Sequence, residues 1–243
     1  MAEVILYDLP SKGHCAAWSY NPSTHQTFTA RLVLNYKQIP YKTEWTEYPD
    51  IAPKLKSLRL SPNDDATPYT IPTICDTNGK YMMDSRKIAS ELEKQYPEPS
   101  LHLDSPILPK VQAVLAQAHA FLRGVVLPPI PTNLLRDPSA EYFLRTREAR
   151  FGMPLSQVAR EQGGEEAWKG AEPAFNKIGE LLREQGGPFI MGKIVSYADF
   201  VIVSVLHFIK RIDEKIFERV VQIEPALKEL YDASREWLKR DDY

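Results

Sequence analysis

The stretch at residues 69–85 constrains the fold of this chain most strongly. It reads YTIPTICDTNGKYMMDS, and its first half is rich in β-branched residues, which favour strands. Asn78-Gly79 is typical of a type I′ hairpin turn, which needs φ > 0 at both central positions. Asp84-Ser85 then opens a segment in which apolar residues recur at helical spacing. The sequence therefore predicts a strand, a tight turn, a second strand and the start of a helix.

Pro72 is the unusual residue of this hairpin. Proline has no N–H for a sheet ladder, so it marks an edge, a strand start or backbone that a ligand can reach, and a cis Ile71-Pro72 bond would be a specific feature. We expect the backbone of Ile71 and Thr73 to be available to a ligand. The helix start at Asp84-Ser85 offers N–H groups and a dipole that favour an anion. An ordinary hairpin leading into a capped helix fits the same residues.

Composition excludes several classes of function. The net charge of −2 provides no electrostatic footprint for nucleic acid or an anionic membrane. The longest apolar stretch, residues 200–209, is too short to span a bilayer, and the N-terminal residues are unlike a signal peptide. Cys15 and Cys75 lack CxxC spacing, which argues for a reducing compartment, and the five histidines lack metal-ligand spacing. We expect a cytosolic protein without a metal, and neither nucleic acid nor membrane as a partner.

The two halves of the chain encode different elements. The first half reads as a β-α-β-α-β-β-α module, with strands at residues 4–9 and 41–48, a helix from residue 27, a short helix within 50–60, and then the hairpin and its helix. Because a helix separates the first two strands, we expect them to be parallel. A proline-rich linker at 98–109 divides residues 1–97 from residues 110–243.

The second half is predicted to be entirely helical. Apolar residues recur at helical spacing over 111–125, and Asp137-Pro138 is typical of an N-cap followed by proline in the first turn. Ser196 and Asp199 form a capping-box pattern. That box begins a helix through residue 212 that is apolar nearly all round, so we expect it to be central. The fold class is therefore α/β followed by all-α.

With these pieces in place, the chain resembles the cytosolic glutathione transferases. The resemblance covers essentially the whole chain and is carried by Ile71-Pro72-Thr73-Ile74, Asp84-Ser85 and GKIVSYADF at 192–200. Residues 35–51 and the AWS at 17–19 are similar to the fungal Fu-type transferases, which are related to bacterial lignin β-etherases. The resemblance implies a thioredoxin-like N-terminal domain, an all-helical C-terminal domain and a homodimer.

The resemblance also implies how glutathione is held. Backbone at Ile71 would pair with the cysteinyl part, as a strand added to an edge. The γ-glutamyl carboxylate would lie at the helix start, with Asp84 facing the ammonium group. One of two lysines is a candidate for the glycine carboxylate, although an exposed lysine is more often simply solvated. The implied glutathione-binding residues are Ile71, Pro72, Thr73, Asp84, Ser85, Lys54 and Lys56.

The sequence gives three candidates for the group that activates the thiol and does not decide between them. A thiol with a pKa near 8.5 needs a donor beside a helix N-terminus to become a thiolate at neutral pH. Related transferases place a serine at the start of the first helix, followed by an aromatic residue and then Arg or Lys. Anchoring on Phe28 and Arg31 gives Thr24, with Ser23 beside it, whereas the Trp-Ser pair gives Ser19. At least two of the three hydroxyls are loop or cap residues.

Cys15 offers a competing mechanism. A cysteine in this loop can form a mixed disulfide with glutathione, as in cysteine-type thiol transferases, if Lys12, His14 and the helix start lower its pKa. It lies well upstream of the helix start for that role. Cys75 lies in the hairpin strand and is expected to be a small core residue.

The predicted function is attack of a glutathione thiolate on an apolar or aromatic electrophile. Conjugation, peroxide reduction and aryl-ether cleavage are variants of this step, and detoxification is the role they imply. The second substrate is expected between the two halves, with Trp18, Tyr20, Leu127 and Tyr142 lining its site. The alternative is a ligandin-type protein that stores apolar phenolics and catalyses little.

Overall fold

A mixed sheet organises the first domain. The computed structural model describes residues 3–13, 16, 20–21, 26–27, 29–64 and 67–241, with backbone only at 20–21 and 26–27. In this part of the chain the main sheet has four strands in the order β4-β1-β5-β6. β1 runs parallel to β4, as predicted, and antiparallel to β5. The strands are β1 (Val4–Asp8), β4 (Tyr41–Trp45), β5 (Thr73–Cys75) and β6 (Tyr81–Met83).

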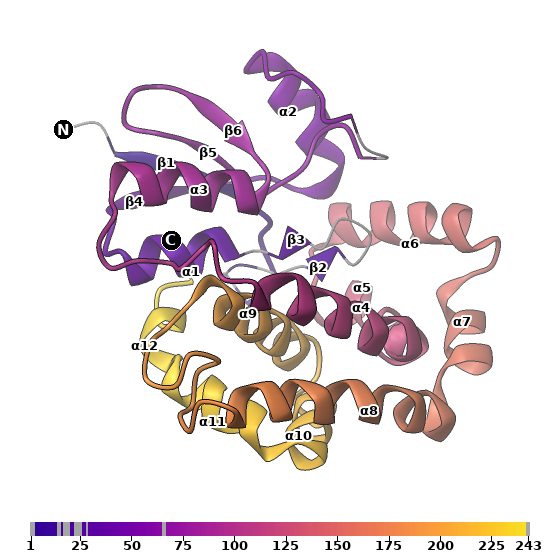
Figure 1. Ribbon diagram of the computed structural model, residues 1–243. Helices are drawn as coiled ribbons and strands as arrows, with labels where there is room; N and C mark the ends of the chain where they lie inside the picture. The colour runs from indigo at the N-terminus through magenta and orange to yellow at the C-terminus, as the bar shows by residue number, and fades with distance from the viewer. Residues whose placement is uncertain are drawn as a thin grey trace.

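Three helices accompany this sheet: α1 (Thr29–Tyr36), α2 (Ile51–Ser57) and α3 (Ser85–Gln95). α1 and α3 lie side by side between the sheet and the helical domain (Figure 1). Their apolar faces close the core, in which Leu6, Leu32, Ile74 and Ile88 are fully buried. The observed order of elements confirms the predicted thioredoxin-like β-α-β-α-β-β-α module.

Two of the predicted boundaries in this domain are wrong. Helix α1 begins at Thr29 rather than at residue 27, because Thr27 is paired with Tyr20 between β2 (Tyr20–Asn21) and β3 (Gln26–Thr27) and is therefore extended. Strand β4 ends at Trp45 rather than at residue 48, because a 3₁₀ turn, η1 (Tyr48–Asp50), takes over there.

The hairpin turn also differs from the prediction. Gly79 has a φ of +79°, but Asn78 lies outside the left-handed region, so the type I′ prediction is wrong. The Gly79 N–H donates to the Asp76 carbonyl at 3.0 Å. The Asp76 carboxylate accepts from the N–H groups of Asn78 and Lys80, both at 2.9 Å. The aspartate thus stabilises a turn over residues 76–79 that ends, rather than centres, on the glycine.

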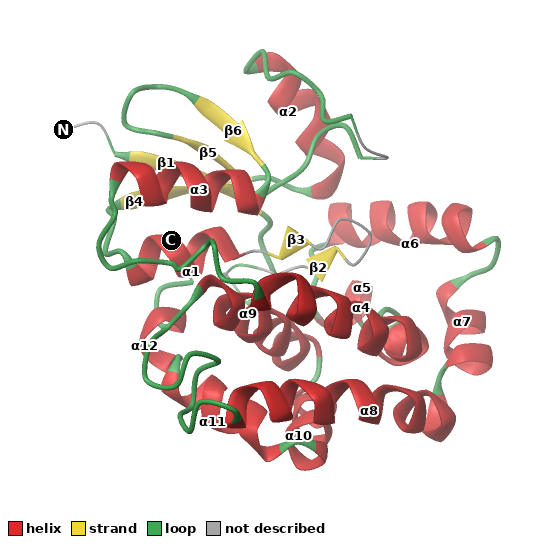
Figure 2. Ribbon diagram, viewed as in Figure 1, coloured by secondary structure: helices red, strands yellow, loops and turns green. Residues whose placement is uncertain are grey.

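The second domain is helical in the part that the structure describes, as Figure 2 shows. α9 packs against α1, α4, α10 and α11, and Phe200 and Ile202 within it are fully buried. The prediction of a central helix here is confirmed. The helices are α4 (Ile107–Val126), α5 (Ile130–Asn133), α6 (Asp137–Phe151), α7 (Leu155–Gln162), α8 (Gly164–Arg183), α9 (Tyr197–Ile212), α10 (Glu214–Ile223), α11 (Pro225–Ala233) and α12 (Arg235–Leu238).

The sequence motifs predict two helix starts in this domain, and the structure confirms one of them. The capping box of α9 is present: the Asp199 carboxylate accepts from the Ser196 N–H at 2.8 Å and from its hydroxyl at 2.7 Å. It also accepts from the Ile190 N–H at 2.8 Å, which ties the preceding loop to the helix. At α6 the N-cap residue is Arg136, so Asp137 is the first helical residue rather than the cap.

The end of the described chain returns to the first domain. The Asn35 side-chain amide donates to the carbonyls of Trp237 at 2.6 Å and Arg240 at 3.1 Å. The Arg240 guanidinium lies 3.9 Å from the centre of the Tyr41 ring. Among the described residues, no helix has the length and apolar character needed to cross a membrane.

Candidate functional site

The start of α3 is built by the hairpin that precedes it. Asp84 has a φ of +78°, in the left-handed region, and its Oδ1 accepts from the N–H groups of Arg86 at 2.8 Å and Lys87 at 3.2 Å. Two of the first-turn donors expected to meet an anion are therefore held by the N-cap aspartate itself. The Ser85 N–H is the first-turn donor that lies outside this cap. An anion at this helix start would meet Ser85 first.

Ile71 and Thr73 occupy different positions in the hairpin. The Ile71-Pro72 peptide bond is cis, and Ile71 precedes β5 and lies outside its ladder. Thr73 lies inside β5, paired with Tyr7 of β1 on one side and Met83 of β6 on the other. Its hydroxyl donates to the Thr70 carbonyl at 2.8 Å. Of the two residues predicted to offer backbone to a ligand, Ile71 is therefore the remaining candidate.

The starts of α1 and α3 meet at Tyr197, which the sequence motifs do not mark as a site residue. The Thr29 hydroxyl, at the first residue of α1, lies 2.8 Å from the Tyr197 hydroxyl. Burial raises the pKa of Tyr197, and the side chains of Thr29 and of Ser85, the first residue of α3, oppose the rise, so the phenol is neutral. The only signal in the sequence is that Tyr197 follows the N-cap residue of the capping box.

Arg86 completes this contact between the domains. Its guanidinium carbon lies 5.4 Å from the centre of the Tyr197 ring, and its Nη2 donates to the Leu103 carbonyl in the segment that joins α3 to α4. The Tyr197 N–H donates to the Leu101 carbonyl of that segment at 2.8 Å. The tyrosine is therefore fixed through its backbone, its ring face and its hydroxyl.

Arg31, one of the two residues from whose positions Thr24 is chosen as a candidate, is a structural residue of the first domain. Its Nε and Nη2 donate to the Asp8 carboxylate at 3.0 and 2.8 Å, and its Nη1 donates to the Tyr41 hydroxyl at 3.2 Å. Both members of the ion pair are buried. Arg31 thus holds the body of α1 against β1 and β4.

The two candidate lysines differ in their surroundings. Lys54 forms an ion pair with Glu44, and its ammonium lies 5.9 Å from the centre of the Tyr7 ring. Lys56 is exposed, and its ammonium lies 5.5 Å from the centre of the Tyr69 ring at the entry to the hairpin. Because the charge of Lys54 is already balanced by a carboxylate, Lys56 is the better candidate for an incoming anion.

The candidate thiol-activating residues Ser19, Ser23 and Thr24 and the candidate nucleophile Cys15 lie outside the described residues. The described neighbours of this loop are held by the helical domain. The Lys12 N–H donates to the Leu134 carbonyl at 2.9 Å, and the Ala16 N–H donates to the Asp241 carbonyl at 2.8 Å. Cys75 is buried in β5, which supports its assignment as a core residue.

The candidate second-substrate residues are only partly described. Trp18 and the Tyr20 side chain lie outside the described residues, and Leu127 is half-buried at the end of α4. Tyr142 of α6 stacks on Tyr48 of η1, with ring centres 6.0 Å apart. The Ser139 hydroxyl beside it accepts from the Tyr48 N–H at 2.8 Å. Tyr142 therefore belongs to a second contact between the two domains.

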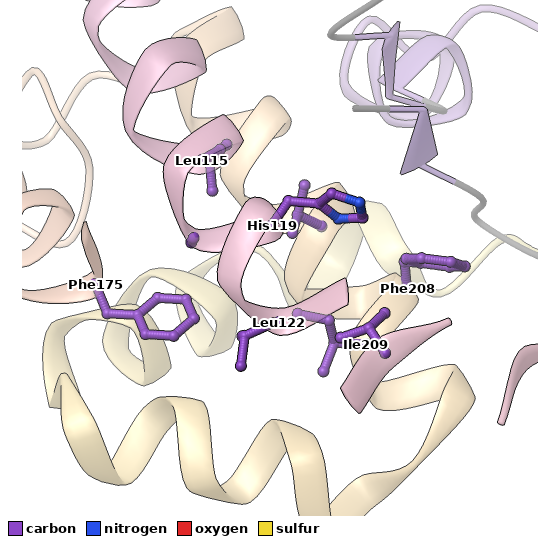
Figure 3. Close-up of a pocket in the computed structure, with 9 residues that line it drawn as sticks. Leu115, His119, Leu122, Phe175, Phe208 and Ile209 are labelled. Carbon is purple, nitrogen blue, oxygen red and sulfur yellow. The ribbon is translucent and has the colours of Figure 1, made fainter. Parts of the chain in front are cut away.

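An apolar pocket lies within the helical domain (Figure 3). Figure 3 shows His119 of α4 among Leu115, Leu122, Phe175, Phe208 and Ile209. Burial, together with Arg123 and Arg150, lowers the pKa of His119 to about 4, so its imidazole is neutral at physiological pH. In the described part of the chain, no three His, Cys, Asp or Glu side chains are grouped to hold a metal ion.

Comparisons with known proteins address both domains. Residues 25–95 match the glutathione S-transferase N-terminal domain and residues 111–237 match the C-terminal domain. A glutathione S-transferase-like protein of Aspergillus flavus, ustS, is 33% identical over 93% of this chain and 87% of its own length.

Solved structures of fungal glutathione transferases are among those similar over the full length of this chain. Glutathione transferase GSTFuA2 of Phanerochaete chrysosporium has a TM-score of 0.82 and 29% identity, with 100% of both chains covered. A glutathione S-transferase of Ceriporiopsis subvermispora in complex with glutathione has a TM-score of 0.77 and 29% identity over 99% of this chain and 100% of its own.

Proposed function

Because this chain belongs to the glutathione S-transferase family, we propose that it binds glutathione across the starts of α1 and α3 and activates the thiol. The thiolate then attacks a small apolar or aromatic electrophile. The observation that carries this proposal is the convergence of the two helix starts on Tyr197: the Thr29 hydroxyl of α1 lies 2.8 Å from its hydroxyl, and the Arg86 guanidinium of α3 lies over its ring. The glutathione-bound relative described above supports the ligand.

The γ-glutamyl end of glutathione fits the start of α3. A helix N-terminus carries about half a positive charge, which favours a carboxylate there. The Ser85 N–H is the donor for this carboxylate, because the Asp84 side chain already holds the next two N–H groups. Asp84 supplies the negative charge that suits the γ-glutamyl ammonium. Ile71, beside Pro72 and Thr73, provides the strand edge for the cysteinyl backbone, and Lys56 or Lys54 the cation for the glycine carboxylate.

The thiol end fits the start of α1. Each unit by which the thiol pKa falls corresponds to about 1.4 kcal/mol of preferential stabilisation of the thiolate. A helix N-terminus and one hydroxyl donor supply an effect of this size. Ser23, Thr24 or Ser19 is the proposed donor, and Cys15 is the alternative if the chain is a thiol transferase that forms a mixed disulfide.

The proposal also covers the second substrate, the cellular location of the protein and its oligomeric state. Trp18, Tyr20, Leu127 and Tyr142 are proposed to line an apolar site between residues 1–97 and 110–243, which residues 98–109 join. Conjugation, peroxide reduction and ether cleavage all begin with attack by the same thiolate. Conjugation and ether cleavage end with a carbon–sulfur bond, whereas peroxide reduction needs a second glutathione and gives glutathione disulfide. A cytosolic location and a homodimer remain predictions.

Thermal melting in reduced glutathione tests the proposal. A ligand at about 100 times its Kd stabilises the native state by about 2.7 kcal/mol, which corresponds to a rise of about 5–10 °C in Tm for a chain of this size. We expect such a rise at millimolar glutathione and a smaller one in Ser85→Pro, which lacks the proposed donor. No rise in the unmodified protein would contradict glutathione binding.

Activity measurements separate the mechanisms. With a chromogenic aromatic electrophile, alanine at the activating hydroxyl should lower kcat by at least tenfold, about 1.4 kcal/mol, whereas alanine at the other two candidates should not. Full activity in all three variants would exclude a hydroxyl of this loop, and full activity in Cys15→Ser would exclude the cysteine route. Binding of apolar phenolics without turnover would favour the storage role.

A further inference from the structure

Three helices from both domains begin at one point. Thr29 is the first residue of α1, Ser85 of α3 and Tyr197 of α9. Their side chains carry three hydroxyls, and the residues are 0%, 3% and 2% exposed. Thr29 and Tyr197 are 168 positions apart in the sequence, yet their hydroxyl oxygens are 2.8 Å apart. The contact is almost completely shielded from water, and the Thr29–Tyr197 hydrogen bond joins the two domains there.

Tyr197 is held firmly on the side of the helical domain. Its backbone N–H donates to the Leu101 carbonyl at 2.8 Å, and the neighbouring Ser196 is held by the Asp199 carboxylate through two hydrogen bonds of 2.8 and 2.7 Å. The Arg86 guanidinium lies over the ring. A tyrosine fixed in this way can set the positions of the two helix starts that contact it.

We propose that the Tyr197 hydroxyl positions the glutathione site by fixing the spacing between the start of α1 and the start of α3. This inference rests on the proposed function, in which the thiol lies at one helix start and the γ-glutamyl carboxylate at the other. Tyr197 is buried and acts through Thr29 and the first turn of α3 rather than on the tripeptide. It is a positioning residue that the helical domain contributes to a site in the first domain.

The consequence concerns a ligand that must reach both helix starts at once. Without the phenol oxygen, the Thr29 hydroxyl loses its hydrogen bond to α9. The start of α1 is then no longer tied by this bond to the tyrosine that Arg86 of α3 contacts. Glutathione would then have to restore the spacing on binding, which weakens its affinity. The thiol would also lie less well against the start of α1, so its pKa when bound should rise.

The test is Tyr197→Phe, which removes only the oxygen. We expect the Kd for reduced glutathione, measured by titration calorimetry, to rise about 3- to 10-fold, the range that corresponds to loss of one neutral hydrogen bond. The pKa of the bound thiol, followed by thiolate absorbance against pH, should rise as well. Thr29→Val should give the same changes, Thr29→Ser should behave as the unmodified protein, and the Phe/Val double variant should be no worse than either single variant.

Tyr231→Phe is the matched control. The Tyr231 hydroxyl lies 2.7 Å from Nδ1 of His207, and both residues belong to the helical domain. Loss of this hydrogen bond should lower Tm in the same way but leave the glutathione Kd and the pKa of the bound thiol unchanged. If Tyr197→Phe does not fold, Thr29→Val decides the question.

The outcomes separate the inference from the proposed function. If the unmodified protein does not bind glutathione, the proposed function fails. If it binds and Tyr197→Phe and Thr29→Val bind with the same Kd and the same thiol pKa, the inference alone is overturned. An equal rise in Kd in Tyr231→Phe would also overturn it, because the effect would then be one of general stability.

Discussion

The starts of α3 and α1 lie close together but are built in different ways. The start of α3 is capped by Asp84, the residue just before it, after a hairpin whose turn is stabilised by Asp76. The start of α1 is held by Tyr197, which lies 168 positions further along the chain. One half of the candidate site is therefore encoded locally, and the other half depends on the fold of a second domain.

This difference has a functional meaning. The cap of the α3 start, where we place the γ-glutamyl carboxylate, forms within residues 69–87, although Arg86 of this start also contacts the Tyr197 ring. The α1 start, where we place the thiol, is correct only when the helical domain is docked. Substitutions that act locally should affect mainly the first, and substitutions that act between domains should affect mainly the second.

The largest effect is expected from Arg31→Met, which tests whether the body of α1 is anchored within its own domain. The substitution leaves the Asp8 carboxylate buried without its ion-pair partner. Removal of one member of a buried pair typically costs about 3–5 kcal/mol. Chemical denaturation should show a loss of this size in the free energy of unfolding, and a loss below about 1 kcal/mol would contradict a structural role.

Arg31 also illustrates which features of the structure can be predicted from the sequence and which cannot. The module order, the parallel β1–β4 pair and the capping box of α9 could be predicted because each rests on local spacing or on a short motif. The pairing of Arg31 with Asp8 and of Thr29 with Tyr197 could not, because periodicity places residues on a face but does not identify their partners across the chain. The turn at residues 76–79 was mispredicted because the Asp76 carboxylate outweighed the Asn-Gly preference.

A middle-sized effect is expected from Asp84→Ala, which removes the local cap. Loss of an N-cap costs about 1–2 kcal/mol, and alanine at a φ of +78° adds about 1 kcal/mol of backbone strain. Denaturation should show a loss of about 2–3 kcal/mol. The glutathione Kd should rise in parallel, because Asp84 also faces the γ-glutamyl ammonium.

Asp84→Asn is the control for that substitution. Asparagine tolerates the left-handed region and keeps a side-chain oxygen for the cap, but it has no charge for the ammonium. We expect it to recover most of the stability and little of the glutathione affinity. If affinity recovered together with stability, Asp84 would be a cap only.

The smallest effect is expected at His119, which lines the apolar pocket of the helical domain. Its folded-state pKa of about 4 is below the unfolded value of 6.5, so the unfolded chain binds a proton first as the pH falls. The stability that the neutral ring contributes is present above about pH 6.5 and is lost as the pH falls toward 4.

His119→Leu should remove this pH dependence. Because part of the ring is exposed, we expect the free energy of unfolding of the unmodified protein to drop by only about 1 kcal/mol more than that of the variant between pH 7 and pH 5. Paired denaturation curves at the two pH values provide the measurement. Equal drops would show that His119 titrates normally, and the glutathione Kd should be the same in both proteins at pH 7.

A crystal structure of the protein with reduced glutathione tests the central claim most directly. The account predicts the γ-glutamyl carboxylate within hydrogen-bond distance of the Ser85 N–H and the sulfur at the start of α1, with the Thr29–Tyr197 contact intact. Glutathione bound with its carboxylate away from the start of α3, or with its sulfur away from the start of α1, would contradict the account.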